Sequence, residues 1–158
     1  MDFKQIDYYF TYALDCAHKA RQQNEVPVGA VLVDSAGKIL SKTFNTKEYE
    51  HNACNHAEVL AITEASEHQR SWRLTGHKLF VTLEPCVMCM GAIIQSRISE
   101  VYFGAYDPKG GAISLGFNIH SHPKLNHKVK VYGGFKHREC SKLLSDFFRA
   151  KRAKYIKN

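Results

Sequence analysis

"KLFVTLEPCVMCMGAIIQS", residues 78–96, is the stretch from which the fold class can be read. Its first six residues are mostly apolar, as expected for a strand that is buried in a sheet. Pro85 interrupts the strand pattern, and proline is common at the start of a helix. The apolar stretch from Cys86 to about Ser96 is therefore predicted to be a helix. A buried strand that leads directly into a helix is the repeating unit of α/β proteins.

The same alternation of strands and helices continues on both sides of this segment. Apolar residues recur at steps of three or four over residues 3–22, which predicts an amphipathic helix. "VPVGAVLVD" (26–34) and "KILSKTF" (38–44) flank the turn-forming "SAGK", so they predict a hairpin. The other predicted elements are a helix over 56–68, a strand over 100–106, a strand over 128–134 and a helix over about 137–155; residues 113–127 are ambiguous.

This order of elements predicts one α/β domain over residues 1–158. The length suits a single domain with a substantial core. Two β-α-β units imply parallel pairing with right-handed crossovers, whereas the first two strands pair antiparallel. We therefore expect a mixed five-stranded central sheet with helices on both faces, which is a three-layer α/β/α arrangement.

The composition narrows the protein class. The net charge of +7 suggests an acidic partner such as nucleic acid, although simple solubility would also explain it. No run approaches the roughly 18 apolar residues of a membrane span. The N-terminus lacks the basic start and apolar centre of a signal peptide, so we expect a cytoplasmic protein. Five cysteines in such a protein argue against a disulfide framework.

Cys86 and Cys89 form a Cys-x-x-Cys pair in the first turn of a predicted helix. Unpaired backbone N–H groups and the helix dipole at this position favour the thiolate, which is the form that binds zinc. A redox dithiol would gain from the same position, and a pair packed in a core helix would show the same spacing. The pair alone leaves all three interpretations open.

His56 and Glu58 gain meaning from their position. A His-x-Glu triplet decides little in a chain with nine histidines. His56, however, opens a predicted helix after a polar loop, much as Cys86 does, and functional groups collect at the carboxyl ends of parallel strands. His56, Cys86 and Cys89 would give three zinc ligands and leave the fourth position to water, as in catalytic sites. Glu58 would then suit general acid/base work on that water.

The pattern H-x-E…P-C-x-x-C is the signature of the zinc-dependent nucleobase deaminases. Beyond this signature, the chain resembles the bacterial tRNA-specific adenosine deaminases (the TadA family) along nearly its whole length. The "DPKGGA" loop and the "SDFFR" segment are more particular to these tRNA enzymes. The segments that carry the resemblance include "EVPVGAVLV" (25–33), "HAE" (56–58), "VTLEPCVMC" (81–89), "FGAYDPKGGA" (103–112), "NHKV" (126–129) and "LLSDFFRAKR" (143–152).

The resemblance implies a cytidine-deaminase-like fold and the hydrolysis of adenosine to inosine at the wobble position of a tRNA anticodon. It implies one zinc ion per subunit, held by His56, Cys86 and Cys89. Hydroxide bound to that zinc would attack C6 of a flipped adenine while Glu58 moves protons. It also implies a homodimer that contacts the tRNA anticodon stem-loop with both subunits. The substrate contacts that it implies are Asn45, Ala57, Asp107, Lys109, Phe148, Arg149 and Arg152.

The C-terminal segment supports RNA binding on its own residues. Its last ten residues carry no acid, and aromatic residues lie among the cations. Cations that meet phosphates beside aromatics that stack on bases suit single-stranded loops, while a solvated basic tail is the alternative. The cations are Arg149, Lys151, Arg152, Lys154 and Lys157, and the aromatics are Phe147, Phe148 and Tyr155.

Several residues leave alternatives open. Cys54 is an ordinary loop cysteine, a redox-sensitive thiol, or a fourth ligand that would make the zinc site structural. "HSHPKLNH" (120–127) holds ordinary loop histidines or a second metal site, and Cys16 and Cys140 suit core positions. The rival functions are deamination of a free base such as guanine or cytosine, deamination of single-stranded DNA, and a non-catalytic zinc-stabilised RNA-binding module.

Overall fold

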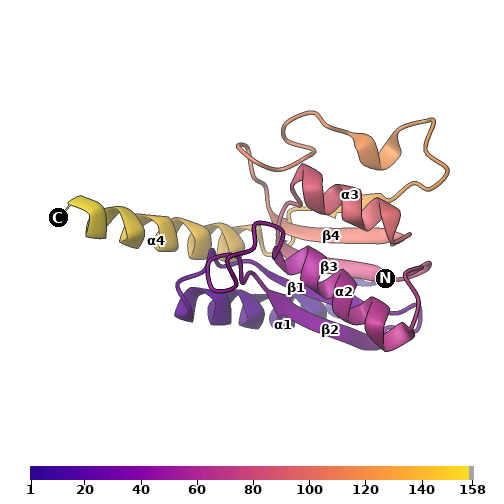
Figure 1. Ribbon diagram of the computed structural model, residues 1–158, viewed down its shortest axis with the longest axis horizontal. Helices are drawn as coiled ribbons and strands as arrows, with labels where there is room; N and C mark the ends of the chain where they lie inside the picture. Colours follow the sequence, from indigo (N-terminus) through magenta and orange to yellow (C-terminus); the bar gives the residue numbers. More distant parts are fainter. Residues whose placement is uncertain (157–158) are drawn as a thin grey trace.

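A mixed five-stranded sheet forms the middle layer of the computed structural model, which describes residues 1–156 (Figure 1). The strand order is β2-β1-β3-β4-β5. The strands are β1 (Gly29–Val33), β2 (Ile39–Phe44), β3 (Lys78–Leu83), β4 (Glu100–Ala105) and β5 (Lys130–Gly133). The helices are α1 (Phe3–Gln22), α2 (Ala57–Gln69), α3 (Val87–Gln95) and α4 (His137–Ile156), with a short 3₁₀ helix, η1 (Ile119–Ser121). Lys157 lies outside the described residues.

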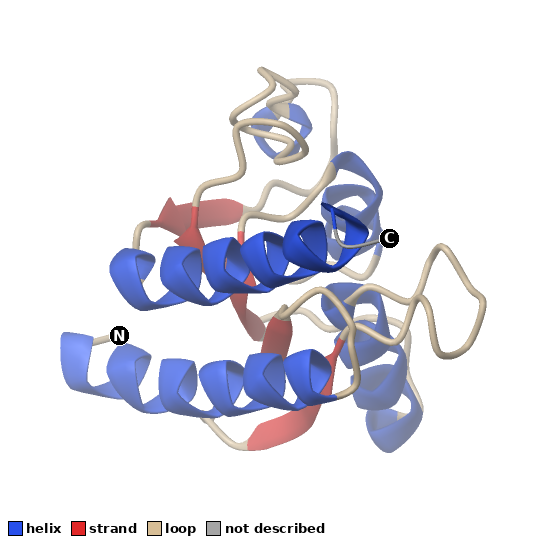
Figure 2. Ribbon diagram, turned by 90° about the vertical axis from the view of Figure 1, so that its left-hand side faces the viewer, coloured by secondary structure: helices blue, strands red, loops and turns tan. Residues whose placement is uncertain are grey.

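The two faces of the sheet carry different helices. Because side chains alternate along a strand, Leu79 and Val81 of β3 pack toward α2 and α3, whereas Phe80 between them packs toward α1. Figure 2 shows α1 and α4 lying along one face, with α2 and α3 on the other. The predicted α/β/α fold is therefore confirmed.

The pairing of the strands corrects one expectation. The β-α-β pattern predicted that β2 and β3 pair in parallel, but β1 lies between them and is antiparallel to both. Only the β3–β4 and β4–β5 pairs are parallel. All five residues of β1 are buried, which suits a central strand, and the partly exposed β2 forms the edge.

The sheet still has an edge at which the carboxyl ends of several strands meet, as the predicted site requires. Because β2 and β3 are each antiparallel to β1, they point the same way, and β4 is parallel to β3. The carboxyl ends of β2, β3 and β4 therefore lie at one edge of the sheet, where the starts of α2 and α3 also lie (Figure 1). No helix in the described part of the chain is long and apolar enough to cross a membrane.

Other boundaries differ by a few residues. The predicted strand over 26–34 starts only at Gly29, since Pro27 in the connector has no N–H for a strand ladder. Helix α1 matches its prediction because Asp2 and Gln5 form a reciprocal capping box at its start. The ambiguous residues 113–127 form turns around η1.

Candidate active site

His56 and Cys86 occupy equivalent places, because each is the N-cap residue of a helix. His56 precedes α2 with φ −78° and ψ 150°, and Cys86 precedes α3 with φ −72° and ψ 174°. Neither side chain caps its own helix, so both are free to face each other. Cys89 lies in the first turn of α3 and is completely buried. The two helix starts thus bring three soft ligands together, as the sequence predicts.

The spacing of these three side chains fits one tetrahedral zinc ion. His56 Nδ1 lies 3.6 Å from Cys86 Sγ and 3.5 Å from Cys89 Sγ. Zinc bonds of about 2.0–2.1 Å to nitrogen and about 2.3 Å to sulfur place tetrahedral N and S ligands about 3.6 Å apart. All three ligand atoms lie within 4.8 Å of one another. His56, Cys86 and Cys89 are therefore positioned to hold one zinc ion.

No other candidate ligand joins this cluster. Among residues 1–156, His56, Cys86 and Cys89 form the only such group of three or more metal-ligating side chains. Cys54 is exposed and lies outside the group, so the site keeps an open fourth position. The histidines of residues 120–127 form no second group; His127 instead bonds to the backbone oxygen of Ile98.

The pKa values of the two cysteine thiols are shifted in opposite directions. Hydrogen bonds from Cys89 and His56 lower the pKa of the Cys86 thiol to about 4, against the opposing effect of burial. The pKa of Cys89 is raised because its thiol donates to Cys86 and is buried. A divalent cation would replace these protons and favour thiolate on both sulfurs.

Glu58 is the second residue of α2, and its side chain is only 3% exposed. Burial raises the pKa of its carboxyl to about 7, while its own backbone N–H, the charge of His56 and the Cys89 thiol work in the opposite direction. Glu58 is not one of the clustered ligands. A carboxyl with a pKa near neutrality can both accept and donate a proton at physiological pH.

Asn45, at the end of β2, caps α2 in place of His56. Its Oδ1 accepts a hydrogen bond from the N–H of Ala57 at 2.9 Å, which satisfies one of the free N–H groups at the helix start. The Ala57 carbonyl accepts from Thr43, and Ala57 is completely buried. Ala57 therefore orients Asn45, whose amide nitrogen makes no hydrogen bond with another described residue.

Glu84 fixes the loop that follows β4, a role that the sequence barely signals. Its buried carboxylate accepts hydrogen bonds from the N–H of Asp107 at 2.9 Å and of Ser114 at 2.7 Å, and from the Ser114 hydroxyl. A Cβ on Gly111 would lie 2.3 Å from the Glu84 carboxyl carbon, so only glycine fits there. The single sequence signal is an acid directly after an apolar strand.

Glu25 does the same for the loop after β2. Its carboxylate is 1% exposed and accepts a hydrogen bond from the N–H of Tyr49 at 2.7 Å. Within that loop, Asn55 donates to Glu50 at 3.1 Å. Two buried acids therefore tie down the two segments that border the metal cluster.

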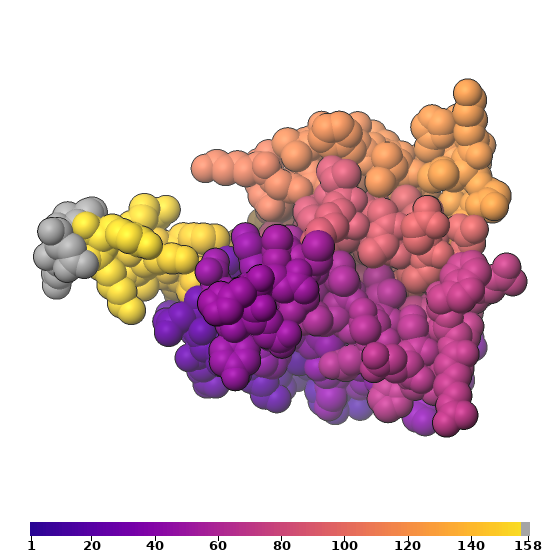
Figure 3. Space-filling model, in the orientation of Figure 1, coloured from indigo at the N-terminus to yellow at the C-terminus, as the bar shows by residue number. Residues whose placement is uncertain are grey.

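An open groove of about 420 Å³ runs between the ends of β3 and β4 and helix α4. Asp107, Lys109 and Phe148, which the family resemblance implies as substrate contacts, all line it. Arg149 and Arg152 do not; both are exposed, and Arg149 lies 3.6 Å from Asp146. Figure 3 shows the last turns of α4 standing clear of the body of the molecule.

Comparison with known proteins connects this geometry to one group of enzymes. Residues 3–105, which include all three ligands, match the family described as the cytidine and deoxycytidylate deaminase zinc-binding region. The tRNA-specific adenosine deaminase of Bacillus subtilis (strain 168) is 44% identical over 150 residues, which cover 95% of this chain and 92% of that protein. The tRNA-specific adenosine deaminase of Haemophilus influenzae is 43% identical over 141 residues, covering 89% of this chain and 82% of that protein.

A solved structure agrees with these relatives. It comes from a study of A-to-I editing by tRNA:A34 deaminases at the wobble position of transfer RNA. It superposes with a TM-score of 0.83 at 39% sequence identity, and the match covers 87% of this chain and 99% of that one. The likeness therefore extends beyond the zinc-binding region to most of the fold.

Proposed function

The chain belongs to the tRNA-specific adenosine deaminases, and we propose that it hydrolyses adenosine to inosine at the wobble position of a tRNA anticodon. The observation that carries this proposal is the open three-ligand cluster of His56, Cys86 and Cys89, with the buried Glu58 beside it. Zinc bound there supplies an activated water at neutral pH. A site with four protein ligands would have supported a structural metal instead.

Glu58 is the proton carrier of the proposed reaction. Its carboxylate takes a proton from the attacking water and delivers it to the adenine ring nitrogen as the C6–O bond forms. Glu58 then takes the proton of the new C6 hydroxyl and passes it to the amine, so that the C6–N bond breaks, ammonia leaves and the C6 carbonyl of inosine remains. Burial keeps the Glu58 carboxyl near the pKa at which both transfers are feasible.

Asn45 and the groove hold the substrate in this proposal. The free amide nitrogen of Asn45 donates a hydrogen bond to the flipped base, and Ala57 fixes its direction. The groove beside Asp107, Lys109 and Phe148 takes the neighbouring nucleotides of the anticodon loop. Its aromatic wall offers base stacking, and its lysine offers a contact to phosphate. Arg149 and Arg152 extend that contact along the exposed part of α4.

We further propose a homodimer formed through the exposed side of α3. Val87 and Met88 are 42% and 37% exposed there, and nothing lies within 4 Å of a Cβ built on Gly91. Leu115 and Phe117 of the following loop are also exposed apolar residues. Apolar patches of this kind are covered in subunit interfaces.

We also propose that residues 1–158 form a single domain. The proposed location is the cytoplasm, where tRNA is found.

The deciding experiment compares substrates. We expect the zinc-loaded protein to form inosine in an anticodon stem-loop RNA with adenosine at the wobble position, but not in the same RNA with guanosine there. Free guanine, free cytosine and single-stranded DNA should release little ammonia by comparison. Ammonia from guanine without inosine in the RNA would contradict the proposal. Inosine mapping in cellular tRNA, with and without the protein, extends the test to the natural substrate.

A further inference from the structure

The loop over residues 46–55 connects two residues of the site directly. It leaves the end of β2 just after Asn45 and returns to the start of α2 just before His56 (Figure 1). The two ends of the loop are joined by a hydrogen bond, in which the N–H of Thr46 donates to the carbonyl of Asn55 at 3.2 Å. The loop is therefore closed at a narrow neck, and this neck adjoins the metal cluster.

The side chain of Asn55 fastens the loop to itself. Asn55 is buried at 9% exposure, and its amide nitrogen donates to Glu50 Oε2 at 3.1 Å and to Thr46 Oγ1 at 3.4 Å. Glu50 also donates its own N–H to the Thr46 carbonyl at 2.9 Å. A hydrogen bond to a carboxylate is stronger than a neutral one, and without it the buried amide would keep only the longer contact to Thr46. We call Asn55 and Glu50 the loop pin.

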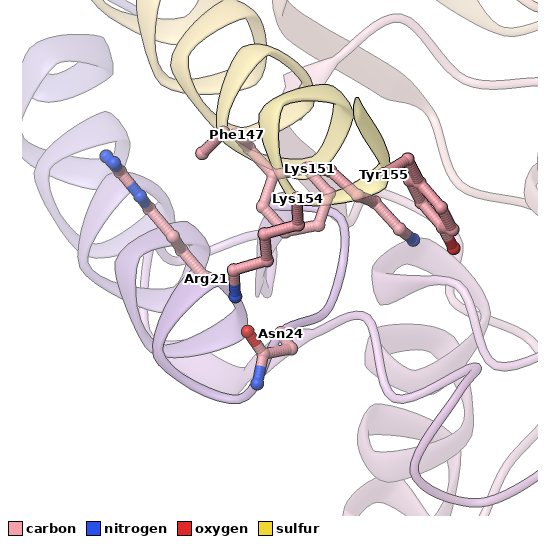
Figure 4. A pocket seen from close by; sticks show the side chains of 7 residues that line it. Arg21, Asn24, Phe147, Lys151, Lys154 and Tyr155 are labelled. Carbon is pink, nitrogen blue, oxygen red and sulfur yellow. The ribbon is translucent and has the colours of Figure 1, made fainter. Parts of the chain in front are cut away.

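A second anchor reaches the loop from outside. Glu25 lies in the connector after α1, where the preceding Asn24 lines a hollow of about 280 Å³ between α1 and α4 (Figure 4). Glu25 itself is buried, and its carboxylate accepts the N–H of Tyr49 at 2.7 Å. The middle of the loop is thus held by Glu25 and its neck by the loop pin. Two such anchors indicate a loop that keeps one shape before any substrate arrives.

The reacting groups are held by other contacts. Asn45 donates its N–H to the Val28 carbonyl at 3.2 Å and accepts the N–H of Ala57 at 2.9 Å. The carbonyl of His56 accepts the N–H of Leu60 at 3.1 Å in the first turn of α2. None of these three bonds involves the loop pin. Loosening the pin should therefore change the shape of the loop and leave Asn45 and the metal cluster in place.

We propose that the loop pin is a pair of positioning residues, Asn55 and Glu50, which fix the loop over 46–55 against the substrate and so set which nucleotides beside the target adenosine the enzyme accepts. This inference rests on the proposed function, because it takes those nucleotides as what the loop meets. A loop that is ordered in advance lowers the entropy cost of binding. The pin therefore acts on KM and on the preference between substrates, and the metal and Glu58 act on kcat.

The test exchanges the donor and the acceptor of the pin. Asn55→Asp sets a second carboxylate against that of Glu50, so repulsion replaces the hydrogen bond. In the double variant Asn55→Asp/Glu50→Gln, the new amide donates to the new carboxylate, and the bond returns in the opposite direction. The two single variants and the double variant form a double-mutant cycle. The matched control is Asn52→Asp, which adds the same charge to the same loop but keeps an oxygen to accept the Cys54 N–H at 3.0 Å.

Amide hydrogen exchange reads the state of the loop without RNA. We expect exchange in the peptide over 46–55 to be about tenfold faster in Asn55→Asp, and within about threefold of the parent in the double variant and in the control. Zinc content should stay at one per chain in all of them. Unchanged exchange in Asn55→Asp, or equal acceleration in Asn52→Asp, would overturn the proposal.

Kinetics with the zinc-loaded protein measure the consequence for the reaction. For an anticodon stem-loop with adenosine at the wobble position, Asn55→Asp should raise KM about tenfold and keep kcat within about twofold, and the double variant should recover KM. The ratio of kcat/KM between two stem-loops that differ only in the nucleotide before the target should move toward one in Asn55→Asp.

Two kinetic outcomes contradict the proposal. An unaltered ratio between the two stem-loops would show that the pin does not set substrate preference, and a fall in kcat at the parental KM would place it in the chemistry. A parent protein that makes no inosine would refute the proposed function instead. The exchange comparison would then still decide whether Asn55 and Glu50 hold the loop.

Discussion

Glu84 accepts a hydrogen bond from the backbone N–H of Asp107 at 2.9 Å, and so joins the turn of metal ligand Cys86 to the loop bordering the groove. The same carboxylate holds the backbone N–H of Ser114. Because Glu84 is only 2% exposed, these bonds are shielded from water. Glu84 is thus a positioning residue: it sets where Asp107 and Lys109 lie relative to the metal.

Replacing this carboxylate tests that role. In Glu84→Gln, the amide NH₂ would face one of the N–H groups that the carboxylate now accepts, so one hydrogen bond is lost. We expect the free energy of unfolding to fall by about 1–3 kcal/mol, KM for the stem-loop RNA to rise, and zinc content to stay the same. The matched control is Glu67→Gln, at an exposed position of α2. An unchanged KM would show that the loop does not depend on Glu84.

The proton-carrying role of Glu58 is tested by Glu58→Gln. The amide keeps the size of the side chain but cannot accept and return a proton. We expect zinc content and melting temperature close to the parent values, and a loss of about 10²–10⁴-fold in kcat. Single-turnover formation of inosine, with zinc quantified in the same sample, makes the measurement. Parental turnover in this variant would refute the mechanism proposed above.

The ligand set predicts opposite results for two cysteines. Cys89 is buried with its sulfur 3.5 Å from His56 Nδ1, so Cys89→Ala should lose most of the bound zinc. Cys54 is exposed and outside the cluster, so Cys54→Ala should keep one zinc per chain. Metal analysis after dialysis measures both. Zinc loss in Cys54→Ala would restore the fourth-ligand interpretation.

The remaining cysteines should differ in reactivity. Burial raises the pKa of Cys140 to about 12 and also raises that of Cys16, so both stay protonated thiols near pH 8. Cys54 is exposed to reagent. Iodoacetamide treatment of the native zinc-loaded protein, followed by peptide mass spectrometry, should therefore label Cys54 first. Early labelling of Cys140 would mean that the contact between α4 and β4 opens easily.

The proposed dimer predicts an effect of a single charge on α3. Met88→Asp puts an acid near a helix N-terminus, where it suits the helix dipole, so the isolated subunit should remain folded. The same charge in an apolar interface should dissociate the dimer, which light scattering coupled to gel filtration detects. Tyr8→Asp is the control, because Tyr8 is exposed on α1, across the sheet. A parent protein that elutes as a monomer would contradict the proposal directly.

Local patterns in the sequence predicted most of the helices and strands. Helix α1 could be read from its periodic apolar residues, and the metal ligands from two short motifs at helix starts. The predicted pairing of β2 with β3 was wrong, because the order of the elements along the chain does not reveal that β1 lies between these two strands. The apolar run of β1 indicates a buried strand, but it does not show between which two strands that strand lies.

The missed residues share one physical reason. Glu84 acts on backbone groups of Asp107 and Ser114, and Glu25 acts on Tyr49. Each contact joins segments that are distant in the sequence, and an acid at the end of an element has many ordinary explanations. Only the folded arrangement shows which backbone group such a side chain meets.

The placement of His56 and Cys86 at the first turns of two packed helices separates two kinds of change. The loops over 46–55 and 106–129 supply no metal ligand, so changes at positions other than the anchored Asp107, Gly111 and Ser114 should leave the metal geometry in place. Base preference can thus drift among descendants of one scaffold without loss of its chemistry. For directed evolution, a library confined to these loops would explore new substrates and leave the reaction intact.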